Sequence, residues 1–122
     1  MKIQINTDNH IAATEALVAD IENKLTRTLK RFEDQINRVE VHLSDINSAK
    51  SGPNDKRCLI EARVAGMNPI ATRHEAPTVS LAIDGATDRM LAALDSALGK
   101  RREIPRDAGA PPGAGENGPL SD

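Results

Sequence analysis

The sequence predicts an α+β domain in which a four-stranded sheet carries two helices on one face. Two long segments place apolar residues three, four and seven positions apart, a spacing that predicts amphipathic helices. Four short segments alternate apolar with polar residues, a pattern that predicts half-buried strands. The order along the chain is β-α-β-β-β-α. Because each helix has one apolar stripe and each strand one apolar face, a sheet with both helices on the same side buries all of them.

The first strand is expected at residues 2–6, where Ile3 and Ile5 share one face. A helix follows from Thr14 to about Phe32, and the threonine hydroxyl can accept a hydrogen bond from an unpaired amide of its first turn. The apolar stripe of this helix consists of Leu17, Val18, Ile21, Leu25, Leu29 and Phe32. A crossover through the helix makes the first two strands parallel.

The other three strands are expected at residues 38–44, 57–64 and 70–76. A loop at 45–55, rich in Asn, Ser, Gly and Pro, and a tight turn at 66–69 connect them as antiparallel hairpins. The sheet face turned away from the helices is expected to be polar. It carries Lys2, Gln4, Arg38, Glu40, His42, Arg57, Glu61, Arg63 and Arg73.

The second helix is expected within residues 76–102, where Thr78 can cap its start and the cationic residues 100–102 suit its C-terminal end. Its core stripe consists of Val79, Ile83, Ala86, Met90, Leu94 and Ala97. Leu91 and Leu98, seven residues apart, lie beside this stripe. Either they pack on the first helix, or they form a small apolar contact surface.

Length and composition predict one domain at residues 1–102 and a disordered tail at 103–122, where Pro and Gly crowd together. The net charge is −2, so nucleic acid can be bound only through a local basic patch. The N-terminus lacks the apolar run of a signal peptide, and no stretch is long enough for a membrane helix. We therefore expect a cytoplasmic protein without a membrane partner.

Neither a metal site nor a catalytic site is expected. His10, His42, His74 and Cys58 lack the short spacings of metal ligands. By strand parity, we expect His74 to be partly buried and hydrogen-bonded, and Cys58 to be a small buried hydrophobe. The polar residues at 42–45 lie on opposite faces of a strand, which spoils a catalytic triad. We expect no enzyme, no cofactor and no small-molecule substrate.

Short motifs in a fixed order carry a resemblance to a known family. They are Lys2-Ile3-Gln4-Ile5, Thr14-Glu15-Ala16-Leu17, the helix end at 24–32, Arg38-Val39-Glu40-Val41-His42-Leu43, and Glu75-Ala76 leading to Ala82-Ile83-Asp84. Over roughly residues 1–102, the chain resembles ribosome hibernation promoting factors and ribosome-associated inhibitor A, also described as sigma-54 modulation or ribosomal subunit interface proteins. Long members of that family have an additional C-terminal dimerisation domain, so this chain resembles a short form.

The resemblance implies binding to the small ribosomal subunit and its rRNA, and silencing of translation by steric occlusion in stressed or stationary cells. Whether ribosomes are silenced singly or as dimers, and whether the protein self-associates, stays open. The candidate RNA-binding residues are basic, because each would neutralise a phosphate and release counterions. They are Lys24, Arg27, Lys30, Arg31, Lys56, Arg89, Lys100, Arg101 and Arg102.

The same charges also have interpretations that involve no RNA. Lys24, Arg27 and Arg31 share one face of the first helix, which is also typical of a solvated helix surface. Cross-strand pairing explains the charges of the open sheet face without a ligand. Those charges belong to Glu40, Glu61, Glu75, Arg57, Arg63 and Arg73. The loop cations Lys50 and Lys56 are better RNA candidates than the strand cations, because loops can reach into RNA grooves.

The outward face of the second helix departs from the family, which usually carries Lys and Arg there. Asp84, Asp88 and Asp95 form an acidic stripe on this face, and such a stripe repels phosphates. The alternative function is therefore a protein-interaction module on the same fold, which docks a protein partner through its acidic, leucine-bearing second helix.

Overall fold

The computed structural model describes residues 1–46 and 55–107, with side chains as far as Gly99. The chain divides into two compact units, Met1–Leu91 and Ala92–Asp122. The first unit holds the sheet, the first helix and the beginning of the last helix, and the second unit continues that helix. Within the described ranges, no helix combines the length and the apolar composition needed to cross a membrane.

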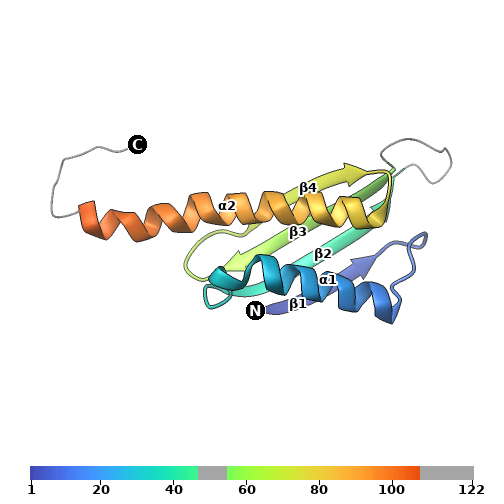
Figure 1. Ribbon diagram of the computed structural model, residues 1–122, viewed down its shortest axis with the longest axis horizontal. Coiled ribbons are helices and arrows are strands. Elements are labelled where there is room, and N and C mark those ends of the chain that lie inside the picture. The colour runs from blue at the N-terminus through green and yellow to red at the C-terminus, as the bar shows by residue number, and fades with distance from the viewer. Residues whose placement is uncertain (47–54, 108–122) are drawn as a thin grey trace. The chain divides into compact units, whose positions relative to one another are not determined.

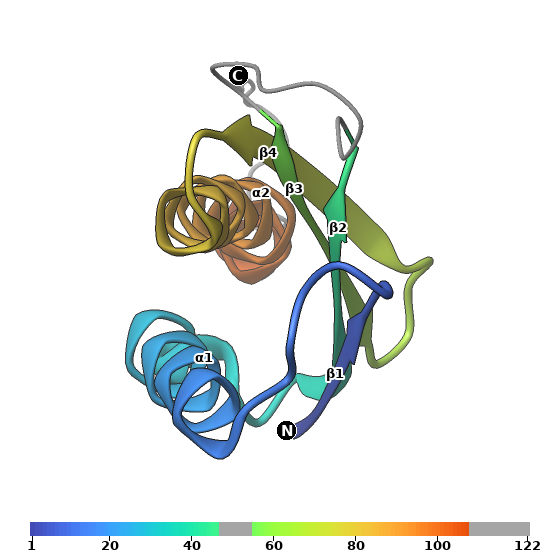
Figure 2. The same cartoon turned by 90° about the vertical axis from the view of Figure 1, so that its right-hand side faces the viewer.

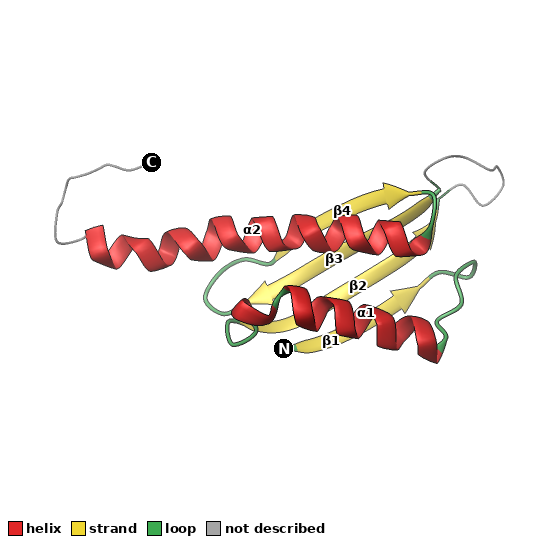
Figure 3. Cartoon of the chain, viewed as in Figure 1, coloured by secondary structure: helices red, strands yellow, loops and turns green. Residues whose placement is uncertain are grey.

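The elements follow the predicted order, and the α+β class is confirmed (Figure 1). Figure 3 shows the same chain by element type, with four strands and two long helices. The bounds are β1 (Lys2–Thr7), α1 (Glu15–Thr28), the short 3-10 helix η1 (Lys30–Phe32), β2 (Ile36–Asp45), β3 (Lys56–Val64), β4 (Ile70–Ala76) and α2 (Val79–Asp107).

The sheet is mixed, with the strand order β1-β2-β3-β4. β1 pairs with β2 in parallel, so the chain crosses over through α1 as the sequence predicts. β2 with β3, and β3 with β4, are antiparallel hairpin neighbours. In Figure 2, α1 and the beginning of α2 lie on the same side of the sheet. No described helix of the first unit covers the opposite sheet face.

The core of the first unit lies between the sheet and these helices, and it is aliphatic apart from one phenylalanine. Its buried residues include Val39, Val41, Leu43, Cys58, Ile60 and Ala62 from the strands, and Ile21, Leu25, Leu29, Phe32, Ala82, Ile83, Ala86 and Met90 from the helical segments. Burying each large side chain contributes ~1.5–3 kcal/mol before the entropy of ordering is subtracted. Burial also raises the pKa of the Cys58 thiol to about 12, in agreement with its prediction as a buried hydrophobe.

Both predicted helix caps are present. The Thr14 hydroxyl accepts a hydrogen bond from the Leu17 amide at 3.1 Å, and the Thr78 hydroxyl accepts one from the Leu81 amide at 3.1 Å. Each such cap is worth about 1 kcal/mol. The turn before β4 contains Gly66 with a φ of 77°, a left-handed conformation that glycine adopts without a Cβ clash.

The ends of two helices differ from the predicted bounds. α1 ends at Thr28, because Leu29 leaves the α region at φ −100° and ψ 14°, and η1 continues the chain to Phe32. α2 runs to Asp107, past the predicted domain end at residue 102 and through Pro105, a residue that is unfavourable inside an α-helix. The rest of the predicted tail, residues 108–122, lies outside the described residues.

The leucines beside the core stripe of α2 are not an exposed surface. In the second unit, Leu98 is buried, with 4% of its surface exposed, and Leu94 is buried as well. Leu91, the last residue of the first unit, is half-buried. Because Leu98 is buried, it cannot belong to the apolar contact surface that was one of the two alternatives for these leucines.

Candidate nucleic-acid interface

Three predicted RNA-binding residues lie exposed at the C-terminal end of α1 and on η1: Arg27, Lys30 and Arg31. The Arg27 Nε donates a hydrogen bond to the carbonyl of Asn23 at 3.4 Å, one turn earlier in the helix. The Lys30 Nζ lies 3.5 Å from the Glu33 carboxylate, but its side chain is 72% exposed, so this pair holds it weakly. These cations make up the α1 basic end, which is accessible to a polyanion.

Arg31 is oriented by the one aromatic side chain of the protein. Its guanidinium carbon lies 4.9 Å from the centroid of the Phe32 ring, a cation–π distance. Phe32 is fully buried and therefore fixed in the core. The contact thus anchors the guanidinium of Arg31 to the rigid part of the fold.

Lys24 differs from these three cations, because its charge is already paired. Its Nζ forms an ion pair with the Asp84 carboxylate, which joins α1 to α2. Both side chains are only partly exposed, 27% for Lys24 and 40% for Asp84. Lys24 is therefore held between the helices, and one carboxylate of the predicted acidic stripe is compensated. Asp88 and Asp95, the other members of that stripe, are exposed.

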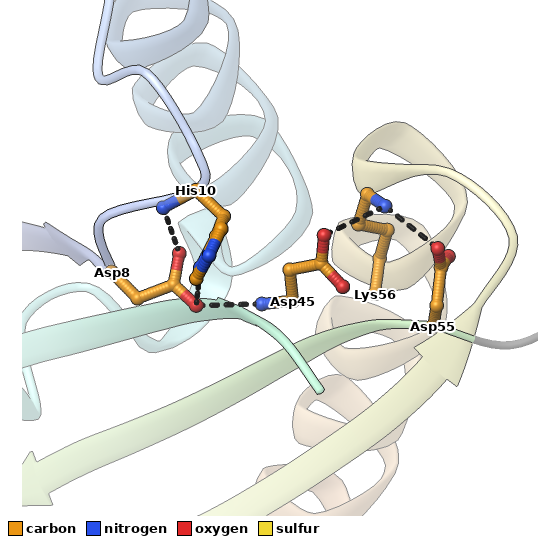
Figure 4. A network of polar contacts seen from close by, with 5 residues as sticks. All are labelled: Asp8, His10, Asp45, Asp55 and Lys56. Carbon is orange, nitrogen blue, oxygen red and sulfur yellow. Dashed lines mark hydrogen bonds and ion pairs between the residues drawn. The ribbon is translucent and has the colours of Figure 1, made fainter. Parts of the chain in front are cut away.

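Another predicted RNA-binding residue, Lys56, belongs to a polar network at the ends of β2 and β3 (Figure 4). Its Nζ donates to Asp55 at 3.0 Å and lies 3.5 Å from Asp45. The amide of Asp45 in turn donates to the Asp8 carboxylate at 2.8 Å, and the same carboxylate accepts from the His10 amide at 2.9 Å. The network ties the segment after β1 to the end of β2.

The charges of this network shift the pKa values of its members. The hydrogen bond to Asp55, together with the nearby Asp45, raises the pKa of Lys56 above its ordinary value. The hydrogen bond from the Asp45 amide lowers the pKa of Asp8. Lys56 is thus flanked by two carboxylates, which compensate its charge. It is therefore a poorer phosphate ligand than the sequence suggested. Lys50, the other loop candidate, lies outside the described residues.

The open sheet face carries many ion pairs, and several of them join residues of the same strand where the sequence predicted pairing across strands. Glu40 on β2 is its centre, with only 15% of the side chain exposed. Its carboxylate lies 2.7 Å from Arg38 Nη2, 3.5 Å from His42 Nε2 and 3.9 Å from Arg63 Nε. These contacts explain Arg38, His42 and Arg63 without a ligand.

Arg57 and Arg73 show how the register decides which cation is paired. Arg57 on β3 lies opposite Glu75 on β4, and its Nη2 is 3.1 Å from that carboxylate. Arg73 lies opposite Leu59, which offers it no charge. Within the described residues, Arg73 forms no ion pair, so the expectation that pairing also accounts for this residue is wrong.

α2 approaches β4 closely at two adjacent small residues. A Cβ on Gly85 would lie 2.1 Å from the His74 ring, so only glycine leaves room for the imidazole. Beside it, the Thr72 hydroxyl donates to the Ala86 carbonyl at 3.0 Å. His74 is half-buried, as predicted, but the predicted hydrogen bond to its ring is not found among the described residues.

A pocket of about 380 Å³ lies where β4 meets α2. Its lining consists of Arg73, His74, Glu75 and Arg89. Arg89 is the one predicted RNA-binding residue of α2 whose side chain is described, and it is exposed. The predicted cations Lys100, Arg101 and Arg102 belong to α2, but their side chains lie outside the description.

The sequence pattern of the sigma 54 modulation protein / S30EA ribosomal protein family matches residues 3–102. The chain belongs to this family. The resemblance found in the sequence is thereby confirmed, over nearly the same residues.

Two solved structures are similar to this S30EA-family protein. A ribosomal subunit interface protein from Coxiella burnetii superposes with a TM-score of 0.65 at 21% identity, over 79% of this chain and 96% of that one. The N-terminal domain of Protein Y from Thermus thermophilus gives a TM-score of 0.64 at 25% identity, over 79% of this chain and 98% of that one. At 21% identity, the similarity to the Coxiella burnetii protein supports a shared fold and nothing further. A search of curated proteins found no significant match.

Within this S30EA-family fold, the predicted cations whose side chains are described have different surroundings. Arg27, Lys30 and Arg31 come together at the α1 basic end, whereas Lys24 is paired with an acid and Arg89 lies at the β4 pocket. Sequence spacing alone identified the α1 group, because residues three and four apart share a helix face.

Sequence reasoning missed that Arg73 lines the same pocket as Arg89. The two residues belong to different elements, and the polar parity of β4 predicts only that Arg73 faces outward. The signal that singles it out is the register that places it opposite Leu59. That register follows from the geometry of the turn between β3 and β4, which residue spacing alone does not define.

Proposed function

We propose that this S30EA-family protein associates with the small ribosomal subunit in the cytoplasm and binds its rRNA. Bound there, it silences translation in stressed or stationary cells by occupying a site that messenger and transfer RNA need. The observation that carries the proposal is family membership over residues 3–102. The exposed cations of the α1 basic end supply a surface that suits RNA.

Binding is electrostatic in this proposal and takes place through the RNA backbone. Arg27, Lys30 and Arg31 each neutralise a phosphate, and the released counterions make the affinity fall with salt. The protein has no Trp or Tyr, and its single Phe32 is fully buried, so no Trp, Tyr or Phe ring is available to stack on bases. Affinity therefore depends on the shape and the charge of the RNA more than on its base sequence.

Silencing requires no chemistry in this proposal. The fold acts as a rigid obstacle, held together by a buried aliphatic core and two capped helices. A folded domain that occupies an RNA-lined site excludes other ligands from it by steric overlap.

The alternative, a protein-interaction module on α2, receives less support. Of its two leucines, Leu98 is buried and Leu91 is half-buried, and Asp84 is engaged by Lys24. A docking helix needs its apolar anchors exposed, and these are not.

A cell-free translation reaction tests the proposed silencing. Increasing amounts of purified protein should lower the yield of a reporter, and the double variant Arg27→Glu/Arg31→Glu should lower it much less. A matched control is Lys2→Glu, which reverses an exposed charge on β1, outside the α1 basic end. Full reporter synthesis at saturating wild-type protein would show that silencing is wrong.

A further inference from the structure

The pocket between β4 and α2 carries positive charge without compensating acids. Within the described residues, neither Arg73 nor Arg89 forms an ion pair. The one carboxylate in the lining, Glu75, is already bound by Arg57, whose Nε and Nη2 donate to its Oε2 at 3.3 and 3.1 Å. The charge of Glu75 is thus largely cancelled, and the two guanidinium groups set the sign of the local potential.

Close packing gives the pocket a defined wall. The His74 ring lies against Gly85, where a side chain would occupy the same space. The hydrogen bond from Thr72 to the Ala86 carbonyl fixes β4 to α2 beside it. The elements that carry Arg73 and Arg89 are therefore held at a constant separation, even though both side chains are exposed.

We propose that this pocket binds a phosphate group. A guanidinium presents a planar fork of N–H donors that matches phosphate oxygens, and two of them line this pocket. The volume of about 380 Å³ admits a phosphate together with part of the group that carries it.

The phosphate has two possible sources. In RNA, it would be a backbone phosphate, and the site would then rest on the proposed function and extend the interface beyond the α1 basic end. In a small molecule, it would be a free phosphate or diphosphate, and the site would be independent of ribosome binding. The chemistry of recognition is the same in both cases.

Two probes distinguish these sources. Isothermal titration with pyrophosphate measures free phosphate binding, and fluorescence anisotropy with a labelled RNA hairpin measures backbone binding, both at low salt. The variants are Arg73→Gln and Arg89→Gln, with Lys2→Gln as the control that removes an equal charge from the exposed β1 position. At least one probe should bind the wild type and lose roughly tenfold in affinity with each pocket variant, because a charge-assisted contact is removed. Lys2→Gln should keep the wild-type affinity.

The double variant Arg73→Lys/Arg89→Lys tests whether binding depends on the geometry of the two guanidinium groups or only on their positive charge. It preserves both charges but removes both forks, so its affinity should also fall. The proposal is overturned if Arg73→Gln and Arg89→Gln match Lys2→Gln with both probes, if the wild type binds neither probe, or if the double lysine variant binds as the wild type does. Pyrophosphate binding that depends on Arg73 would stand even if the protein failed to bind the small subunit, so the two proposals can fail separately.

Discussion

Lys24 of α1 forms an ion pair with Asp84 of α2, and the pair joins the two helices within the first unit. The lysine belongs to the predicted RNA-binding set and the aspartate to the predicted acidic stripe, so the two features partly cancel each other. Asp84, one of the acidic residues by which α2 departs from the family pattern, therefore helps to hold the two helices together. The remaining carboxylates of the stripe still repel phosphates.

Removal of the Asp84 charge should strengthen the binding of polyanions. In Asp84→Asn, the ammonium of Lys24 is released and one repulsive carboxylate is lost, so RNA affinity at low salt should rise several-fold. Stability should fall by at most about 1 kcal/mol, because both side chains are partly exposed. Fluorescence anisotropy and urea unfolding measure the two effects.

The control for this prediction is Asp88→Asn, which removes a charge from the same helix at an exposed position. It should raise affinity less, since it lowers repulsion without releasing a lysine. Equal gains in the two variants would mean that only the net charge matters.

Gly85 should be the least replaceable residue at the contact of α2 with β4. Gly85→Ala gains about 1 kcal/mol of helix propensity but places a Cβ 2.1 Å from the His74 ring. The overlap should cost more than the gain, with a net destabilisation of about 1–3 kcal/mol. Urea unfolding measures this difference.

Gly99 on the same helix provides the matched control, because a Cβ there meets no atom within 4 Å. Gly99→Ala should therefore stabilise by up to about 1 kcal/mol. The double variant Gly85→Ala/His74→Ala should recover part of the loss, because the ring that obstructs the Cβ is removed. A destabilised Gly99→Ala, or no recovery in the double variant, would contradict the steric explanation.

Thr87 should tolerate replacement by a residue without a hydroxyl. Its side chain is fully buried, and Oγ1 has no hydrogen-bond partner among the described residues. Thr87→Val keeps the shape and removes an unsatisfied polar atom, so stability should rise by about 1 kcal/mol. Thr78→Val makes the same chemical change at a capping hydroxyl and should lower stability by about 1 kcal/mol. If both variants lose stability, Thr87 has a partner in solution.

Asp8 should make stability depend on acidic pH. The amide of Asp45 lowers the pKa of Asp8 in the folded state below its ordinary value of 3.8. A group of this kind stabilises the fold above its unfolded-state pKa, and its contribution is lost as the pH falls through the folded-state pKa. The wild type should therefore lose more stability than Asp8→Asn between about pH 5 and about pH 3.

Unfolding curves at several pH values test this dependence. The exposed Asp20→Asn, on the outer surface of α1, should follow the wild type. Parallel pH profiles of the wild type and Asp8→Asn would contradict the role assigned to the Asp8–Asp45 contact.

The predictions from sequence succeed where local patterns decide the structure. Alternation predicted β4 at residues 70–76, as observed, and the capping roles of Thr14 and Thr78 follow from their positions just before the apolar stripes. These features depend only on neighbours within a turn or a strand.

Features that depend on tertiary contact could not be predicted in this way. The pairing of Lys24 with Asp84 requires the packing of two helices, and the confinement of Lys56 between Asp45 and Asp55 requires the ends of two strands to meet. The unpaired Arg73 requires the register of β4 on β3. Each of these contacts changes the electrostatic role of a residue, and Lys56 belongs to β3 and not to the loop in which the sequence placed it.

Co-sedimentation with purified small ribosomal subunits tests the central claim most directly. At low salt, the wild-type protein and Lys2→Glu should both travel with the subunit, whereas Arg27→Glu/Arg31→Glu should stay at the top of the gradient, because two phosphate-binding charges of the α1 basic end are reversed. A wild-type protein that stays at the top would contradict ribosome association, and a double variant that travels with the subunit as the wild type does would contradict the role of the α1 basic end.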